Sequence, residues 1–140
     1  MTFDSSLVTK SATTLSGTDP SSERHRPSIR FVLVRTSHPG NIGAAARAIR
    51  TMGFTRLVLV QPAHFPHDDA TALAAGAADV LEQAVIVPDL ISAVADCEFV
   101  LGCTARRRAV QLPVLTPRSA AARVAEAAPE AQIAIVFGNE

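Results

Sequence analysis

Short runs of branched apolar residues alternate with longer, alanine-rich segments from Ile29 onward. Apolar runs bounded by proline or polar residues are typical of buried strands, whereas the alanine-rich segments are typical of helices. The expected strands are residues 30–34, 57–61, 84–87, 99–103 and 132–137, and the expected helices are residues 41–52, 70–75, 89–95 and 117–128. Because the two kinds of element alternate, the sequence predicts an α/β fold with a mostly parallel sheet and helices on both faces.

The first 28 residues differ in composition from the rest. They are rich in Ser and Thr and lack periodicity, which is typical of a flexible leader. Residues 29–140 then form one domain, for which an apolar fraction of 48% is ample to build a core. No segment is long and apolar enough to span a membrane and no signal-peptide pattern is present, so we expect a cytoplasmic protein without a membrane partner.

Polar residues follow several of the predicted strands. In a parallel sheet the carboxyl ends of the strands share one edge, and ligands bind outside that edge. The loops expected there are residues 36–41, 62–69, 103–111 and 138–140. We therefore expect the chemistry of the chain to lie at this edge.

The helix that follows the first strand carries the clearest local signals. The Pro-Gly pair at residues 39–40 predicts a turn, Asn41 is a good N-cap, and Gly53 fits the left-handed residue that ends a helix. The interior is almost entirely Ala, Ile and Met, interrupted by two charged side chains, Arg47 and Arg50. Helix propensity does not explain these arginines, so we expect each to have a partner.

Several interpretations of this helix remain open. Arg47 lies among alanines, early in the helix and near the sheet edge, where its guanidinium could hold a phosphate or carboxylate. Gly40 and Gly43 flank Asn41, and residues this small allow a ligand or a neighbouring backbone to approach closely. Asn41 alone could be no more than a helix cap, and Arg50 is either a surface residue or a phosphate contact.

The charges fall into blocks although their sum is zero. Residues 24–67 hold seven arginines and no acid, residues 68–98 hold seven acids and no Lys or Arg, and residues 99–125 hold five arginines and no acid. If the fold brings the two basic blocks together, the chain has a positive face suited to RNA phosphates. The alternative is a set of scattered, solvated charges. The candidate RNA contacts are Arg35, Arg50, Arg106, Arg107 and Arg108.

Metal and thiol chemistry are not expected. Cys97 and Cys103 are predicted to be reduced thiols that are at least partly buried, and no cluster of Cys or His has the spacing of metal ligands. His38, His64 and His67 are interpreted as ordinary loop histidines. The chain also has no glycine-rich dinucleotide loop and no phosphate-binding lysine loop.

Four stretches together resemble the SpoU branch of the SPOUT methyltransferases. The longest reads Ser-His-Pro-Gly-Asn-Ile-Gly-Ala-Ala-Ala-Arg-Ala-Ile-Arg-Thr-Met-Gly-Phe over residues 37–54 and is specific for the branch. Ala-Leu-Ala-Ala-Gly-Ala-Ala-Asp-Val-Leu at residues 72–81 narrows the resemblance to the TrmJ-like group. Gly-Cys-Thr-Ala-Arg at residues 102–106 and Ile-Val-Phe-Gly-Asn-Glu at residues 135–140 complete the set.

This resemblance implies a function and a site. It implies transfer of a methyl group from S-adenosyl-L-methionine to a ribose 2′-hydroxyl of tRNA, at cytidine or uridine 32 of the anticodon loop, by a homodimer with a trefoil-knotted cofactor site. Carried over to this sequence, the catalytic residues are Asn41, Arg47 and Glu140, and the cofactor-binding residues are Cys103, Thr104, Ala105 and Gly138. The resemblance suggests Arg47 as the base. Because a guanidinium holds its proton tightly, a second possibility is that Arg47 grips a phosphate and stabilises the developing alkoxide.

The chain departs from the family pattern at its end. Glu140 lies inside the second motif, and the third motif, an apolar stretch followed by Ser-Leu-Asn, is missing. We therefore expect the knot-forming C-terminal part of the SPOUT fold to be absent. We also expect residues 1–140 alone to bind the cofactor weakly or not at all, and hence to be inactive alone.

Three alternatives to a tRNA methyltransferase remain at this stage. A non-catalytic RNA-binding module would use the basic blocks without a cofactor. A ribosomal RNA ribose methyltransferase would share the chemistry but not the substrate. A small-molecule α/β enzyme would need neither basic block.

Overall fold

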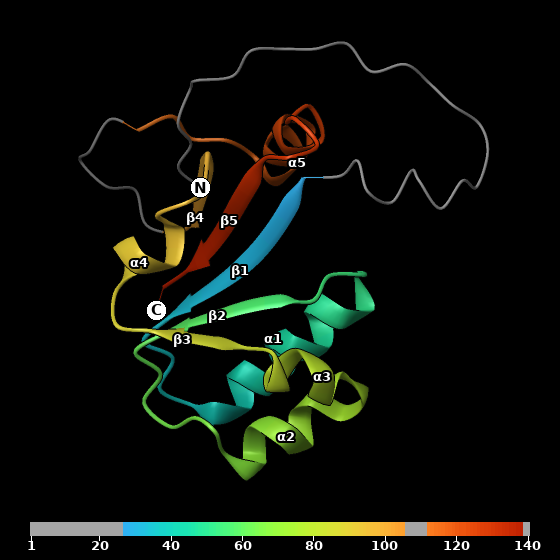
Figure 1. Ribbon diagram of the computed structural model, residues 1–140, viewed down its shortest axis with the longest axis vertical. Helices are drawn as coiled ribbons and strands as arrows, with labels where there is room; N and C mark the ends of the chain where they lie inside the picture. Colours follow the sequence, from blue (N-terminus) through green and yellow to red (C-terminus); the bar gives the residue numbers. More distant parts are fainter. Residues whose placement is uncertain (1–26, 106–111, 139–140) are drawn as a thin grey trace, which may run out of the picture.

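The computed structural model describes residues 27–105 and 112–138, which form one α/β unit (Figure 1). The strands are β1 (Ser28–Val34), β2 (Arg56–Val60), β3 (Val85–Val87), β4 (Phe99–Cys103) and β5 (Gln132–Phe137). The helices are α1 (Pro39–Thr51), α2 (Asp68–Ala74), α3 (Ala78–Glu82), α4 (Leu90–Val94) and α5 (Pro117–Ala125), with a 3₁₀ turn, η2 (Ala75–Ala77), between α2 and α3. The predicted alternation of strands and helices is confirmed.

The five strands form one parallel sheet in the order β3-β2-β1-β5-β4. The central strand β1 pairs with β2 on one side and with β5, the last strand in the chain, on the other. Burial on both faces explains why β1 and β2 read as continuous apolar runs with no alternation. All four residues Leu57–Val60 of β2 are buried.

The helices cover the two faces unequally. Ile42, Ala46 and Ile49 of α1 pack with α2 and α3 against Leu57 and Leu59. The helix α5 covers the β4–β5 part of that same face, because Ile29, Ile133 and Ile135 in its cluster share a side of the sheet with Phe31 and Leu33. On the second face α4 packs against Val32, Val58 and Val60. Helices on both faces are thus confirmed, and Figure 1 shows α4 apart from the other four.

A buried arginine ties α4 to the sheet. Arg30, on β1, is 6% exposed and donates hydrogen bonds to both carboxylate oxygens of Asp96, at 2.8 and 2.6 Å, and to the carbonyl of Ala93 at 3.1 Å. The charge of Arg30 is therefore compensated by Ala93, in the last turn of α4, and by Asp96, just after this helix. Arg30 lowers the pKa of Asp96, chiefly through these side-chain hydrogen bonds.

Two glycines allow α1 and α2 to touch. A Cβ atom on Gly43 would lie 2.1 Å from the carbonyl oxygen of Ala70, and one on Gly40 would lie 2.7 Å from Leu73 Cδ1. Of the two interpretations offered above, the structure supports the close approach of a neighbouring backbone at Gly43, whereas at Gly40 the close neighbours are the side chains of Leu73 and His38.

The differences from the predicted elements have identifiable causes. The helix α1 begins at Pro39 and not at Asn41, because proline fits the first helical position and the side chain of His38 caps the helix. Residues 78–82 form α3. This helix was not predicted, because the small and acidic residues there gave no clear helical pattern. The last helix ends at Ala125, before the predicted Ala128.

Replacing Gly43 with Ala should lower the free energy of unfolding by about 1–3 kcal/mol, because the new methyl group pushes α1 away from α2. The matched control is Gly76→Ala, since a Cβ atom there meets nothing within 4 Å, and it should stay within about 0.5 kcal/mol of wild type. Urea unfolding measures both. Equal stability of the two variants would contradict the packing assignment.

Replacing Asp96 with Asn should lower the free energy of unfolding at neutral pH by about 1–2 kcal/mol, since it weakens a charged hydrogen bond to a buried partner. The folded-state pKa of Asp96 lies below its ordinary value, so the contribution is present above the ordinary carboxyl pKa and is lost as pH falls through the lowered value. The gap between Asp96→Asn and wild type should therefore narrow in acid.

Urea unfolding at neutral and acid pH tests this expectation. Glu98→Gln, which alters an exposed acid nearby, is the control and should unfold like wild type. A gap for Asp96→Asn that is unchanged by acid would mean that the carboxylate charge is not what stabilises the fold.

Candidate functional site

The carboxyl edge of the sheet gathers most of the predicted polar groups that the structure describes. Cys103 of β4 and Leu33 of β1 both pair with Phe137 of β5, so these three strands end side by side. Thr104 and Gly138 follow directly at the same edge. The predicted convergence of strand ends is confirmed for the part of the chain that is described.

Asn41 is not the N-cap of α1. It is the third residue of α1, is exposed, and its backbone N–H bonds to the carbonyl of His38 at 3.1 Å. The N-cap is His38, whose Nδ1 accepts a hydrogen bond from the Gly40 N–H at 3.1 Å. The prediction that Asn41 caps the helix is therefore wrong, and its amide is available at the sheet edge.

Arg47 lies farther from the edge than predicted. It is the ninth of the 13 residues of α1, so it lies about 9 Å along the helix axis from Asn41 at about 1.5 Å per residue. Its side chain is exposed, and within residues 27–105 and 112–138 its guanidinium has no hydrogen-bond or ion-pair partner. It can therefore bind an anion from solution.

Arg50 has a protein partner. Its Nε lies 3.5 Å from Asp79 Oδ2 of α3, and both side chains are about half exposed. The predicted role of Arg50 as an RNA contact must therefore compete with this ion pair, which is weak because it is solvated.

The ends of β4 and β5 carry the predicted cofactor-binding residues. Thr104 and Ala105 are exposed, and a Cβ atom on Gly138 would meet nothing within 4 Å among the described residues. Cys103 is half-buried and free, and burial raises the pKa of its thiol, which keeps the thiol neutral. Cys97 is also free and half-buried, so the prediction for both cysteines is confirmed.

Arg35 and Gln61 follow β1 and β2 at this edge. Arg35 Nε donates to Gln61 Oε1 at 3.3 Å, and Gln61 Nε2 donates to the carbonyl of Pro88 at 2.8 Å. Gln61 was predicted only as the last residue of a strand. A polar residue directly after a buried apolar run, and before a proline, was the available signal.

Several arginines of the first basic block have protein partners, whereas Arg106, Arg107 and Arg108 of the second block lie outside the described residues, so the expected positive face stays a prediction. Arg30 is buried against Asp96, and Arg50 pairs with Asp79, so the acidic block neutralises part of the first basic block. Arg56 lies at the amino end of β2, where it donates to Ser28 and Gln132. Arg35, by contrast, lies at the carboxyl end of β1.

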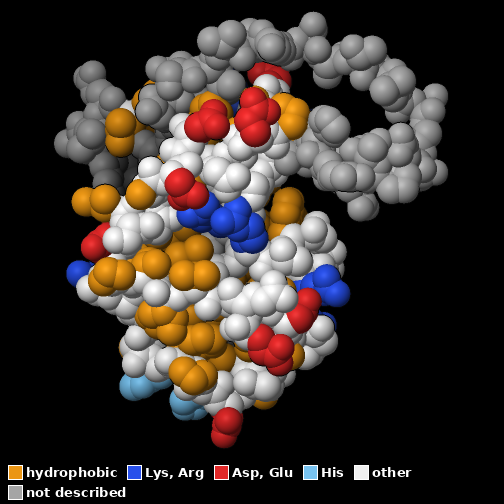
Figure 2. All heavy atoms as spheres, viewed as in Figure 1, with side chains coloured by type: hydrophobic (Ala, Val, Ile, Leu, Met, Phe, Trp, Pro, Cys, Tyr) orange, Lys and Arg blue, Asp and Glu red, His pale blue; other side chains and the backbone are white. Residues whose placement is uncertain are grey.

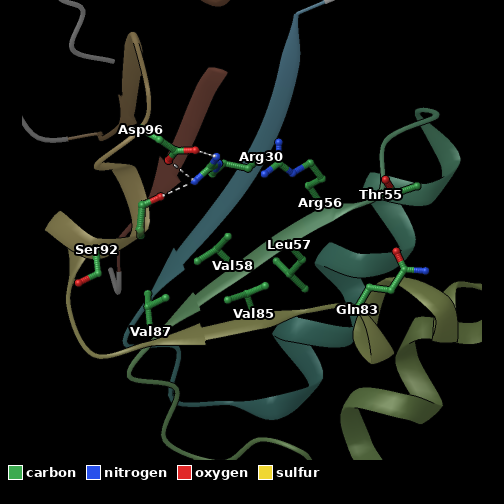
Figure 3. A pocket seen from close by; sticks show the side chains of 11 residues that line it. Arg30, Thr55, Arg56, Leu57, Val58, Gln83, Val85, Val87, Ser92 and Asp96 are labelled. Atoms are coloured by element: carbon green, nitrogen blue, oxygen red, sulfur yellow. Dashed lines mark hydrogen bonds and ion pairs between the residues drawn. The ribbon is translucent and has the colours of Figure 1, made fainter. Parts of the chain in front are cut away.

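A groove of about 430 Å³ lies away from this edge, on the second face near the amino ends of β1 and β2. Figure 3 shows Arg30 and Asp96 on one side of it, Val85 and Val87 on the opposite side, and Val58 between them. None of the predicted site residues lines it. Figure 2 shows hydrophobic side chains beside it, over β3 and α4, and the large exposed apolar residues of these two elements are Val85, Ile86, Leu90 and Ile91.

His67, like His38, caps a helix. Its Nδ1 accepts from the Asp69 N–H at 3.1 Å at the start of α2. Two of the three histidines interpreted as ordinary loop residues therefore have a defined capping role. In the described ranges no three His, Cys, Asp or Glu side chains gather as metal ligands, and no helix is long and apolar enough to cross a membrane.

Comparison with known proteins identifies the family. The sequence pattern of the SpoU rRNA Methylase family matches residues 28–140. The chain belongs to the SpoU methylase family.

Two kinds of relative resemble this SpoU chain. The tRNA (cytidine/uridine/adenosine-2'-O-)-methyltransferase TrmJ of Pseudomonas aeruginosa is 51% identical over 113 residues, which are 80% of this chain and 44% of that protein. A probable methylase family protein from Haemophilus influenzae has a TM-score of 0.75 at 45% identity, covering 81% of this chain and 46% of that one. TrmJ from Z. mobilis has a TM-score of 0.73 at 42% identity, covering 80% and 49%.

The SpoU chain thus spans about half the length of the relatives it matches. The α/β fold and the TrmJ-like resemblance inferred from the motifs are confirmed. Arg106, Arg107, Arg108 and Glu140 lie outside the described residues, as do residues 1–26, so the predictions for them stay predictions.

Two variants of this SpoU domain test whether His38, and not the candidate catalytic residue Asn41, caps α1. His38→Ala should lower the free energy of unfolding by about 1 kcal/mol, because it removes the cap of α1. Asn41→Ala should change it by less than about 0.5 kcal/mol, because the Asn41 side chain is exposed and caps nothing. Thermal unfolding of the two variants side by side measures the two losses of stability. A larger loss for Asn41→Ala than for His38→Ala would mean that Asn41 is the cap after all.

Proposed function

We propose that this SpoU domain transfers a methyl group from S-adenosyl-L-methionine to a ribose 2′-hydroxyl of tRNA, at nucleotide 32 of the anticodon loop. In this proposal it acts as a homodimer in the cytoplasm. The observation that carries the proposal is the 51% identity over 113 residues to a protein named as a tRNA 2'-O-methyltransferase. The polar groups that gather at the carboxyl edge of the sheet support it.

The residues at the ends of β4 and β5 fit the cofactor. Within the described part of the chain nothing lies within 4 Å of a Cβ atom on Gly138, and Thr104 and Ala105 are exposed at the neighbouring strand end, which favours access of a ligand to the backbone there. Cys103, Thr104, Ala105 and Gly138 would hold S-adenosyl-L-methionine. When bound, it supplies an electrophilic methyl group on a sulfonium. The neutral Cys103 thiol suits a wall of such a site, because a thiolate would itself attack the methyl group.

Asn41 and Arg47 would act on the RNA. An exposed amide near the sheet edge can accept and donate hydrogen bonds to a ribose and hold it in one orientation. Arg47 is solvated and free of protein partners in the described ranges, which favours a charged guanidinium that binds the neighbouring phosphate and stabilises a developing alkoxide. The alternative role, proton acceptor, and the role of Glu140 remain part of the proposal.

A second substrate is favoured by one observation. The family whose pattern matches residues 28–140 is described as an rRNA methylase family. A ribosomal RNA ribose methyltransferase would use the same edge and the same residues, so only the substrate distinguishes the two proposals.

Methyl transfer from labelled S-adenosyl-L-methionine tests the proposal. The 140-residue chain is assayed alone and extended by the unmatched part of the Pseudomonas aeruginosa relative, with tRNA, ribosomal RNA, and tRNA bearing a 2′-deoxy nucleotide at position 32. We expect the extended chain to methylate tRNA and to fail on the deoxy substrate. Label on ribosomal RNA alone would favour the second candidate, and no label on any RNA would reject methyl transfer.

In that assay Arg47→Gln should lower the rate by about 100-fold, the usual cost of losing one group that stabilises transition-state charge. Arg118→Gln removes an exposed arginine of α5 and is the matched control, with a rate expected within twofold of wild type. Unchanged methylation by Arg47→Gln would exclude both roles given to Arg47.

A further inference from the structure

Two neighbouring strands end in the same unusual backbone conformation. Arg35 follows β1 with φ of 53°, and Gln61 follows β2 with φ of 47°. The last residues of the two strands, Val34 and Val60, are paired, so Arg35 and Gln61 lie next to each other. A residue with a side chain costs about 1–2 kcal/mol in this left-handed region, so local interactions must hold both in place.

Hydrogen bonds fix the backbone of both residues. The Arg35 N–H donates to the carbonyl of Val60 at 2.8 Å, and the Gln61 N–H donates to the carbonyl of Val87 at 3.3 Å. The peptide links therefore continue the sheet ladder for one step beyond each strand. The left-handed φ then turns each side chain away from the direction that strand alternation would give it.

The side chain of Gln61 connects Arg35 to the backbone of Pro88, and its amide nitrogen and amide oxygen each make one hydrogen bond. Its Nε2 donates to the carbonyl of Pro88 at 2.8 Å, which orients the amide, and its Oε1 accepts from Arg35 Nε at 3.3 Å. The guanidinium is thus held by Nε alone. Its two terminal nitrogens have no protein partner in the described ranges, and the residue is exposed.

We propose that Arg35 and Gln61 form one phosphate-binding unit, in which Gln61 aims the Arg35 guanidinium at a phosphodiester of RNA lying across the carboxyl edge. The two free nitrogens of a guanidinium match two oxygens of one phosphate. Asp89 is the acid nearest to Pro88 in sequence and could compete with a phosphate. Its Oδ1 instead accepts a hydrogen bond from the Ser92 N–H at 2.7 Å. RNA as the source of the phosphate rests on the proposed function, whereas phosphate binding itself does not.

Binding of tRNA to the 140-residue chain, without cofactor, tests the unit by fluorescence anisotropy over a range of salt concentrations. The variants are Arg35→Gln, Gln61→Gly and the double variant. Glycine is chosen because it removes the amide and still adopts a left-handed φ without strain. Arg56→Gln, at the opposite end of the same strand pair, removes one exposed arginine as a matched control.

Arg35→Gln should weaken tRNA binding by about tenfold and reduce the slope of log K against log salt by about one, as expected for one lost phosphate contact. Gln61→Gly should weaken binding by about threefold with the slope retained, since the charge stays but is no longer aimed. Because the two residues act as one unit, the double variant should bind like Arg35→Gln. Arg56→Gln should bind like wild type.

Wild-type affinity of Gln61→Gly, or additive losses in the double variant, would overturn the unit while leaving the proposed methyl transfer untouched. Absence of tRNA binding by the wild-type chain would overturn RNA as the ligand. Phosphate binding without RNA is tested by following the NMR signal of Arg35 Nε during titration with inorganic phosphate. This signal should shift in wild type and need a higher phosphate concentration for the same shift in Gln61→Gly, and a wild-type signal that does not move would overturn phosphate binding.

Discussion

The ion pair between Arg30 and Asp96 is the interaction on which the placement of the second half of the fold depends. A guanidinium in the middle strand of a sheet is costly unless it is paired and hydrogen-bonded. Asp96 and the Ala93 carbonyl accept hydrogen bonds from its two terminal nitrogens, while its buried Nε has no partner among the described residues. The bonds to the terminal nitrogens hold α4 on the second face. The strand β4 starts only three residues after Asp96, at Phe99, so its carboxyl end at Cys103 is set by the same contact.

The candidate site combines rigid and open parts. The helix α1 is held against α2 at backbone distance by Gly43, and its outer side carries Asn41 and Arg47 into solvent. Glycines that flank a candidate catalytic residue were equally compatible with a ligand, yet here they serve helix packing. The candidate cofactor-binding residues lie instead at the neighbouring ends of β4 and β5, where Cys103 pairs with Phe137 directly before Gly138.

Local patterns predicted the strands and the edge at which their carboxyl ends meet. Apolar runs such as residues 31–34 and 57–60 are short, branched and bounded by polar residues, and a parallel sheet follows from their alternation with helices. The start of α1 could also have been predicted, because Pro39 at a first helical position is a stronger signal than Asn41 two residues later. The pairing of Arg30 with Asp96 could not, because 66 residues separate them. For the same reason the charge blocks did not reveal that Arg30 and Arg50 of the basic block pair with Asp96 and Asp79 of the acidic block.

The order of the strands has a consequence for synthesis of the chain on the ribosome. One side of the central strand β1 is completed by β5, whose first residue, Gln132, follows Val34 by 98 residues. At about 5–20 residues per second, that side stays without its native partner for about 5–20 seconds. During this interval β1 and β2 can pair and α1 can cover them, but the β1 edge remains open to any other strand. The nascent chain is therefore most exposed to mispairing at its own centre.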